Sequence, residues 1–195
     1  MYILIQKDEE TVLGHKVWCG FGYNASIESS FQDVRVLSFE KNQKSVPLIV
    51  YSTAEFALRE AARISDIIAK EKGKHISFDI MPLYVYLTEI SNWGVENCSV
   101  PTAPQVLIVK NKNACFGYNI WCGFGEGLTI SDSFEDIRFI RSEKNEKSVC
   151  LEFFSTPEYA IHEAARFTKI IKKEHDKDVL FEMMPLYVLL RQFEG

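Results

Sequence analysis

The chain has 195 residues, an apolar content of 47% and a formal net charge of −5. This length suits one or two small domains, and the composition is that of a soluble globular protein. Both halves share the negative charge evenly, which argues against a nucleic-acid binder, since such proteins normally present a positive surface. No apolar stretch reaches membrane-spanning length, and the N-terminus lacks the basic start and the cleavage site of a signal peptide.

The sequence repeats itself once in register, and equivalent residues are 103 positions apart. Three segments carry the repeat most clearly: Trp-Cys-Gly-Phe-Gly begins at Trp18 and Trp121, Glu-Ala-Ala-Arg at Glu60 and Glu163, and Met-Pro-Leu-Tyr-Val at Met81 and Met184. An internal repeat of this length indicates a duplicated structural unit. We therefore expect two like domains, residues 1–90 and 104–195, joined by a linker at 91–103.

Each copy begins with four predicted strands, because short apolar or alternating runs are separated by glycine-rich or polar segments. The predicted strands are Tyr2–Lys7, His15–Gly22, Phe31–Phe39 and Val46–Tyr51, then Val106–Lys110, Tyr118–Gly125, Phe134–Ser142 and Val149–Phe154. The polar segments Glu40–Ser45 and Glu143–Ser148 predict a turn before the fourth strand of each copy.

One helix follows in each copy. Ser52 and Ser155 open Ser-Thr-x-Glu segments that fit a capping box, in which the serine caps the first helical turn. Apolar residues then recur at helical spacing, and the first helix is expected to end near Gly73.

Each copy ends in an apolar stretch, Ile76–Leu87 or Val179–Leu190, which a proline interrupts. We expect a strand bent at the proline, because proline cannot donate to a strand ladder; a short helix starting there is the alternative. The predicted fold class is α+β, a tandem duplication in which each repeat is a mostly antiparallel sheet of about five strands with one packed helix. The two repeats are expected to pack as a pseudo-dimer.

The five cysteines are odd in number and form no Cys-x-x-Cys pair, which argues against a disulfide framework or a zinc site. Reduced thiols in a cytoplasmic protein are the simpler interpretation. No histidine is shared by the two copies, so we expect no metal and no cofactor. A site present in only one copy, such as one around His15, escapes this comparison.

The repeated Trp-Cys-Gly-Phe-Gly segment is the first candidate site. Cys19 and Cys122 have no shared histidine to act as a base, so a buried cysteine beside a packed tryptophan is the favoured interpretation. The segment Gly20-Phe-Gly-Tyr23 resembles the aromatic RNA-contact strand of the RNA recognition motif, which implies RNA binding. The second copy departs from that pattern, with Glu126 in the place of Tyr23.

The second candidate is a set of repeated charges. Asp and Arg alternate on the predicted third strand, and Glu and Arg lie one turn apart on the helix. The residues are Asp33, Arg35, Glu60 and Arg63, repeated as Asp136, Arg138, Glu163 and Arg166. If strand and helix face each other, these charges form a polar pocket for a small ligand or for acid–base chemistry; the alternative is a structural salt-bridge cluster.

The third candidate is Met-Pro-Leu-Tyr-Val, where Tyr84 and Tyr187 are either recognition aromatics or core residues. Trp93 in the linker is a further candidate contact. Because the sequence holds no catalytic motif, we expect a non-catalytic protein that binds another protein, such as an inhibitor, antitoxin-like or immunity-type regulator. Two linked surfaces gain avidity for such a partner. The alternatives are a nucleotide- or metabolite-binding protein or enzyme with its site at the repeat junction, and an RNA-binding module.

Overall fold

The computed structural model describes residues 1–11, 13–21, 26–33, 45–97, 104–124, 130–136 and 146–194. Within these ranges the chain forms one antiparallel sheet of ten strands together with four α-helices. The α+β class and the antiparallel sheet are therefore confirmed.

The sheet runs in the order β3-β2-β1-β4-β9-β6-β7-β8, while β5 pairs with β1 and β10 with β6. The strands are β1 (Tyr2–Lys7), β2 (His15–Trp18), β3 (Phe31–Gln32), β4 (Ser45–Tyr51), β5 (Asp79–Pro82), β6 (Gln105–Lys110), β7 (Tyr118–Trp121), β8 (Phe134–Glu135), β9 (Ser148–Phe154) and β10 (Glu182–Pro185). Both second strands end at their tryptophan, earlier than expected. Most of the predicted third strands and of the turns after them falls at 34–44 and 137–145, outside the described residues.

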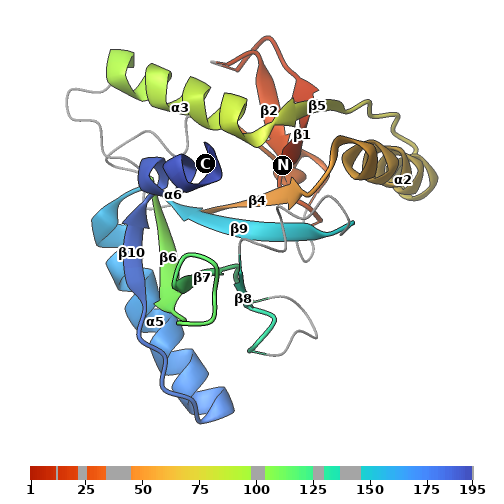
Figure 1. Cartoon of the computed structure of the whole chain (residues 1–195). Helices are drawn as coiled ribbons and strands as arrows, with labels where there is room; N and C mark the ends of the chain where they lie inside the picture. The colour runs from red at the N-terminus through yellow and green to blue at the C-terminus, as the bar shows by residue number, and fades with distance from the viewer. Residues whose placement is uncertain are drawn as a thin grey trace.

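The two halves of the chain meet at β4 and β9, which run side by side through the middle of the molecule (Figure 1). Their register runs from Ser45 opposite Phe154 to Tyr51 opposite Ser148, and Leu48 lies opposite Leu151. The strands of residues 1–82 and of residues 105–185 are thus parts of one continuous sheet.

The helices are α2 (Ala54–Lys72), α3 (Leu83–Asn97), α5 (Pro157–His175) and α6 (Leu186–Glu194). The described part of each half therefore holds two α-helices, and the prediction of one helix per repeat is wrong. The expected bent strand is also wrong beyond the proline, because a helix begins one residue after Pro82 and one after Pro185. Residues 91–97 of the expected linker belong to α3, which places Trp93 in a helix; its side chain lies outside the described part.

The predicted serine caps are wrong as well. Thr53 caps α2 through a hydrogen bond that its side chain accepts from the amide of Phe56 at 3.1 Å, and Thr156 caps α5 in the same way. Ser52 instead continues the β4–β9 contact, because its amide donates to the carbonyl of Lys147 at 3.0 Å and its hydroxyl accepts from that residue's amide at 3.2 Å. The end of α2 is as expected, with Gly73 in the left-handed region at φ 65°.

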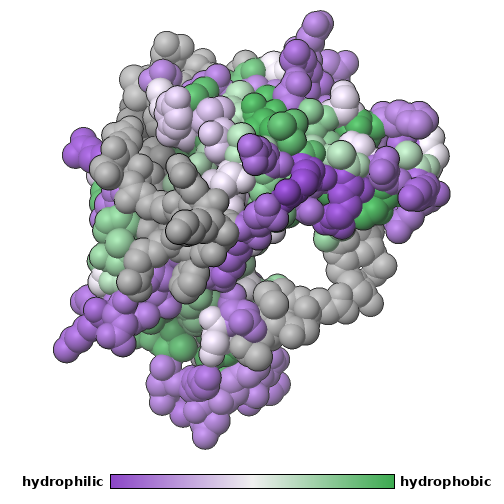
Figure 2. Space-filling model, turned by 45° about the vertical axis from the view of Figure 1, so that its right-hand side comes forward, coloured by the Kyte–Doolittle hydropathy of each residue, from purple (hydrophilic) through white to green (hydrophobic). Residues whose placement is uncertain are grey.

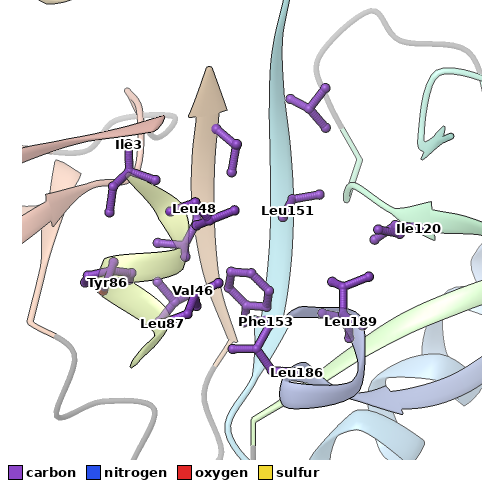
Figure 3. Packing of buried hydrophobic residues seen from close by; sticks show 14 of the residues in the cluster. Ile3, Val46, Leu48, Tyr86, Leu87, Ile120, Leu151, Phe153, Leu186 and Leu189 are labelled. Carbon is purple, nitrogen blue, oxygen red and sulfur yellow. The ribbon is translucent and has the colours of Figure 1, made fainter. Parts of the chain in front are cut away.

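Three hydrophobic cores follow from the alternation of side chains along the strands. On β4 and β9, Leu48 and Leu151 face a central core that α3 and α6 cover, shared by both halves (Figure 3). The opposite face forms two separate cores, one around Trp18 under α2 and one around Trp121 under α5. The sheet is thus buried on both faces at its centre, which explains why its central strands are strongly apolar.

Candidate functional site

Tyr84 and Tyr187 occupy equivalent positions, the second residue of α3 and of α6. Their exposed fractions are 59% and 50%, whereas the preceding residues, Leu83 and Leu186, are buried in the central core. The tyrosines are therefore surface residues and not part of the core. Their role in binding a partner stays a prediction.

Two further equivalent pairs expose large apolar side chains: Phe21 with Phe124, at 54% and 45%, and Leu58 with Ile161, at 58% and 56%. Phe21 packs edge-on against the buried Trp18, with ring centroids 5.0 Å apart, and Phe124 packs on Trp121 in the same way at 4.9 Å. Hydrophobic areas lie among hydrophilic ones on the face seen in Figure 2. The repeated Trp-Cys-Gly-Phe-Gly segment thus buries its tryptophan and presents its phenylalanine.

The repeated Glu and Arg residues lie one turn apart on their helices and form ion pairs. Arg63 Nη2 lies 2.7 Å from Glu60 Oε2, and Arg166 Nη2 lies 2.6 Å from Glu163 Oε2. The hydrogen bond from Arg166 holds the pKa of Glu163 below its usual value, although partial burial opposes this shift. The contact with Arg166 stabilises the charged form of Glu163, and both arginines stay at least half exposed.

The repeated aspartates contact other parts of the fold. Asp136 is buried and accepts hydrogen bonds from the amide of Cys115, at 3.2 and 3.4 Å, in the turn between β6 and β7. The pKa of Lys16 on β2 is raised mainly by its hydrogen bond with Asp8, and the pKa of Tyr86 on α3 mainly by burial; the charge of Asp33 adds to both shifts. Arg35 and Arg138 lie outside the described residues, so a pocket formed by all eight charges stays a prediction.

Glu152 on β9 is a polar residue that the repeat did not reveal. Its carboxylate accepts a hydrogen bond from Trp121 Nε1 at 2.9 Å. Burial raises the pKa of Glu152, while hydrogen bonds from Ser45 and Trp121 oppose that shift; the charges of Glu163 and Arg166 act on it in opposite directions. Residues of β4, β7, β9 and α5 therefore meet in one polar cluster at the junction of the two halves.

The equivalent place in the first half is apolar, because Ile49 occupies the position of Glu152 and Phe56 that of Tyr159. Comparing the two copies for shared residues therefore could not find this cluster. A signal was present in the alternation of the fourth strand, where Glu152 interrupts an otherwise apolar pattern.

The described cysteines are free thiols. Burial raises the pKa values of Cys19 and Cys150 to about 12, and raises that of Cys122 well above its usual value. These thiols stay protonated at neutral pH and are poor nucleophiles. Cys115 is exposed.

A surface hollow of about 300 Å³ lies beside the turn between β6 and β7. Its charged side chain, Lys110, is paired with Glu182 at 2.7 Å, and Asn111 donates a hydrogen bond to Asn119 at 3.1 Å. Lys110 and Asn111 therefore already have protein partners in this hollow. No three His, Cys, Asp or Glu side chains of the described ranges gather as metal ligands. Likewise, none of the helices in those ranges is long and apolar enough to cross a membrane.

Comparison with protein-family models, with curated proteins and with solved structures finds no match for this chain.

Proposed function

We propose that this protein is a non-catalytic regulator or inhibitor that binds another protein through two equivalent surfaces. In this proposal the chain is a tandem duplication whose halves pack as a pseudo-dimer, with the two-fold relation passing between β4 and β9. The register of these strands supports it, since Leu48 lies opposite Leu151, its own equivalent in the repeat. An isologous contact between identical subunits has the same self-pairing geometry.

The exposed aromatics at the starts of α3 and α6 carry the functional part of the proposal. Tyr84 and Tyr187 are both half exposed or more, although the residues before them, Leu83 and Leu186, are buried in the central core. Tyrosine is enriched at the centres of protein interfaces, where it supplies contact area with little loss of conformational freedom. Two such anchors held by one rigid sheet suit a bivalent contact.

The state of the polar groups favours binding over catalysis. The carboxylate of Glu163 is paired with Arg166, that of Glu152 with Trp121, and the half-buried thiols are protonated. None of these groups combines a nucleophile with a base in hydrogen-bond reach, as covalent catalysis requires.

Site-specific photo-crosslinking in the source cell tests the proposal. A benzophenone amino acid would replace Tyr84 in one variant and Tyr187 in another, and the exposed Lys173 at the end of α5 in a matched control. We expect both tyrosine positions to capture the same protein and the control position to capture none. Capture of no protein at either tyrosine, or equal capture at all three positions, would contradict the proposal.

Affinity measurements with the captured protein then test bivalency. If both surfaces bind at once, Tyr84→Ala and Tyr187→Ala should each weaken binding by roughly 10²- to 10⁴-fold, the gain that a second linked contact supplies. If only one of the two variants loses affinity, the protein binds its partner through a single surface.

A second candidate is a small-ligand site at the junction, which the meeting of Glu152, Trp121 and Arg166 favours. A thermal-shift screen with nucleotides and metabolites tests it, because a ligand that binds the folded state raises the melting temperature. A genuine hit should be lost in Glu152→Ile, which introduces the residue of the first half. A screen without any shift removes this candidate.

A further inference from the structure

The hollow beside the turn between β6 and β7 continues the face of the sheet that α5 covers. Val109 on β6 lies directly opposite Asn119 on β7. Because side chains alternate along a strand, Val109 shares its face with Leu107 and Asn119 shares its face with Trp121, and both Leu107 and Trp121 are buried in the core under α5. The apolar wall of the hollow comes from two further residues packed in that core, Ile130 and Phe134.

The polar part of the hollow is a pair of side-chain amides whose orientation is fixed. Asn111 Oδ1 accepts a hydrogen bond from the backbone amide of Asn113 at 3.0 Å, so Asn111 Nδ2 is the atom that donates to Asn119 Oδ1 at 3.1 Å. Each amide nitrogen carries two N–H donors. The contact therefore leaves one N–H of Asn111 and both of Asn119 unused, and the hydroxyl of Ser131 adds a group that donates and accepts.

The first half of the chain fills the equivalent positions with charges that pair with each other. Asp8 and Lys16 stand where the second half has Asn111 and Asn119, and they form an ion pair at 2.5 Å. The second half thus has two neutral amides in place of two opposite charges.

A third exchange has the same direction. Glu28 of the first half is paired with Lys74, whereas the second half has Ser131 in the place of Glu28. The one charged side chain that lines the hollow, Lys110, is paired with Glu182 at 2.7 Å. The second half has therefore replaced charged groups by uncharged hydrogen-bonding groups beside an apolar wall.

We propose that this hollow binds one monosaccharide ring, with an apolar C–H face of the sugar against Ile130 and Phe134 and with sugar hydroxyls on Asn119 and Ser131. A sugar hydroxyl both donates and accepts hydrogen bonds, which matches the mixed set of amide and hydroxyl groups. The volume of about 300 Å³ is at the lower end of the range for ligand pockets and suits a single ring.

The charge of the hollow favours an uncharged ligand. A phosphate or carboxylate would have to compete with Glu182 for Lys110, and a charge bound without a partner is costly to desolvate. The hollow lies at the Lys110 end of β6, whereas Tyr187 follows Pro185, which pairs with Gln105 at the other end of that strand. The sugar site is therefore separate from the tyrosine surfaces and does not depend on the proposed function.

Saturation-transfer difference NMR of the full chain tests the site, because it detects weak binding of small molecules. The sugar probes are the methyl glycosides of glucose, galactose, mannose and N-acetylglucosamine, and the probes of other chemistry are adenine and citrate. We expect saturation transfer to the ring protons of at least one glycoside and none to citrate or adenine.

Variants place the binding in the hollow. Asn111→Asp/Asn119→Lys carries the ion pair of the first half and should weaken binding about tenfold or more, because the two charges then occupy each other. Should this variant not fold, as circular dichroism would show, Ser131→Glu at an exposed position serves in its place. Lys112→Ala is the control, since Lys112 is exposed in the same turn and does not line the hollow.

The control should bind the sugar as the wild type does. The proposal is overturned if none of the four glycosides binds, if adenine or citrate binds in their place, if the folded test variant binds the sugar as tightly as the wild type, or if Lys112→Ala loses it.

Discussion

Leu48 lies directly opposite Leu151 at the centre of the β4–β9 pair, and both side chains are fully buried in the core that the two halves share. Neither half can bury this face without the other. The relationship therefore links the stability of residues 1–97 to that of residues 104–194.

We expect Leu48→Ala and Leu151→Ala each to lower the free energy of unfolding by about 2–5 kcal/mol, the usual cost of truncating a buried leucine. Because the two residues are in one core, the double variant should depart from additivity by about 0.5–3 kcal/mol. Urea denaturation measures this, and the whole chain should unfold in one transition. Leu180→Ala, at a residue 79% exposed, is the control and should change stability by less than about 0.5 kcal/mol. Two separate transitions would show that the halves fold independently.

Glu152 and Glu163 should affect stability with opposite signs. Burial raises the pKa of Glu152 in the folded state, so its contribution is greatest in acid and is lost as the pH rises through that value. We expect Glu152→Gln, which keeps an acceptor for Trp121, to stabilise the protein at neutral pH and to have little effect in acid.

Arg166 lowers the pKa of Glu163, so that carboxylate contributes at neutral pH and its contribution is lost as the pH falls through the lowered value. Glu163→Gln should therefore destabilise the protein at about pH 7, and this effect should disappear in acid once the pH is below the lowered pKa of Glu163. Urea denaturation of both variants at neutral and at acid pH provides the comparison. Shifts of the same sign at neutral pH would show that the two carboxylates are not in the described environments.

Gly20 combines a positive φ of 88° with a close neighbour, because a Cβ at this position would lie 2.6 Å from Ile49 Cδ1. Gly20→Ala should cost about 1–2 kcal/mol through backbone strain and a smaller amount through crowding, because Cδ1 is the free end of the Ile49 side chain and can shift. Ile49→Val removes the crowding atom and should restore part of the loss. Gly73→Ala is the matched control, since its φ is 65° and no atom lies within 4 Å. Equal melting temperatures of the two alanine variants would contradict the close approach.

Thiol labelling should separate Cys115 from the other described cysteines. Cys115 is exposed, whereas burial raises the pKa values of Cys19 and Cys150 to about 12 and that of Cys122 as well. In a Cys98→Ser background, iodoacetamide should modify one site rapidly in the folded protein and the other three only on unfolding. Peptide mass spectrometry identifies the sites. Rapid labelling of Cys19 would show that the core around it opens readily.

Periodicity allowed β4, β9, α2 and α5 to be predicted closely, because each has a regular alternation or helical spacing of apolar residues. The helices after Pro82 and Pro185 were a minority interpretation, since a short apolar run suits a strand or a helix equally well. The spacing of Leu83, Tyr86, Leu87 and Ile90 was the available signal. All four are buried in the central core, and that packing selects the helix.

The candidate sites also divide into those that the sequence indicated and those that only the structure revealed. The repeat identified Tyr84 and Tyr187 but left open whether they were exposed, because exposure depends on how α3 and α6 lie on the sheet. It could not indicate Asn119, Ser131 or Glu152, whose equivalents in the other half are Lys16, Glu28 and Ile49. Residues that break a repeat are found only when their neighbours in space are known.

The sequence by itself determined that this protein has two like halves with strands and helices in the same order, because hydrophobic periodicity and a constant offset are local properties of the chain. Only the tertiary structure decided that β4 pairs with β9 into one sheet, that α3 and α6 cover one shared core, and that Glu152 meets Trp121. Those contacts join segments far apart in sequence, and they depend on which apolar faces can be buried together.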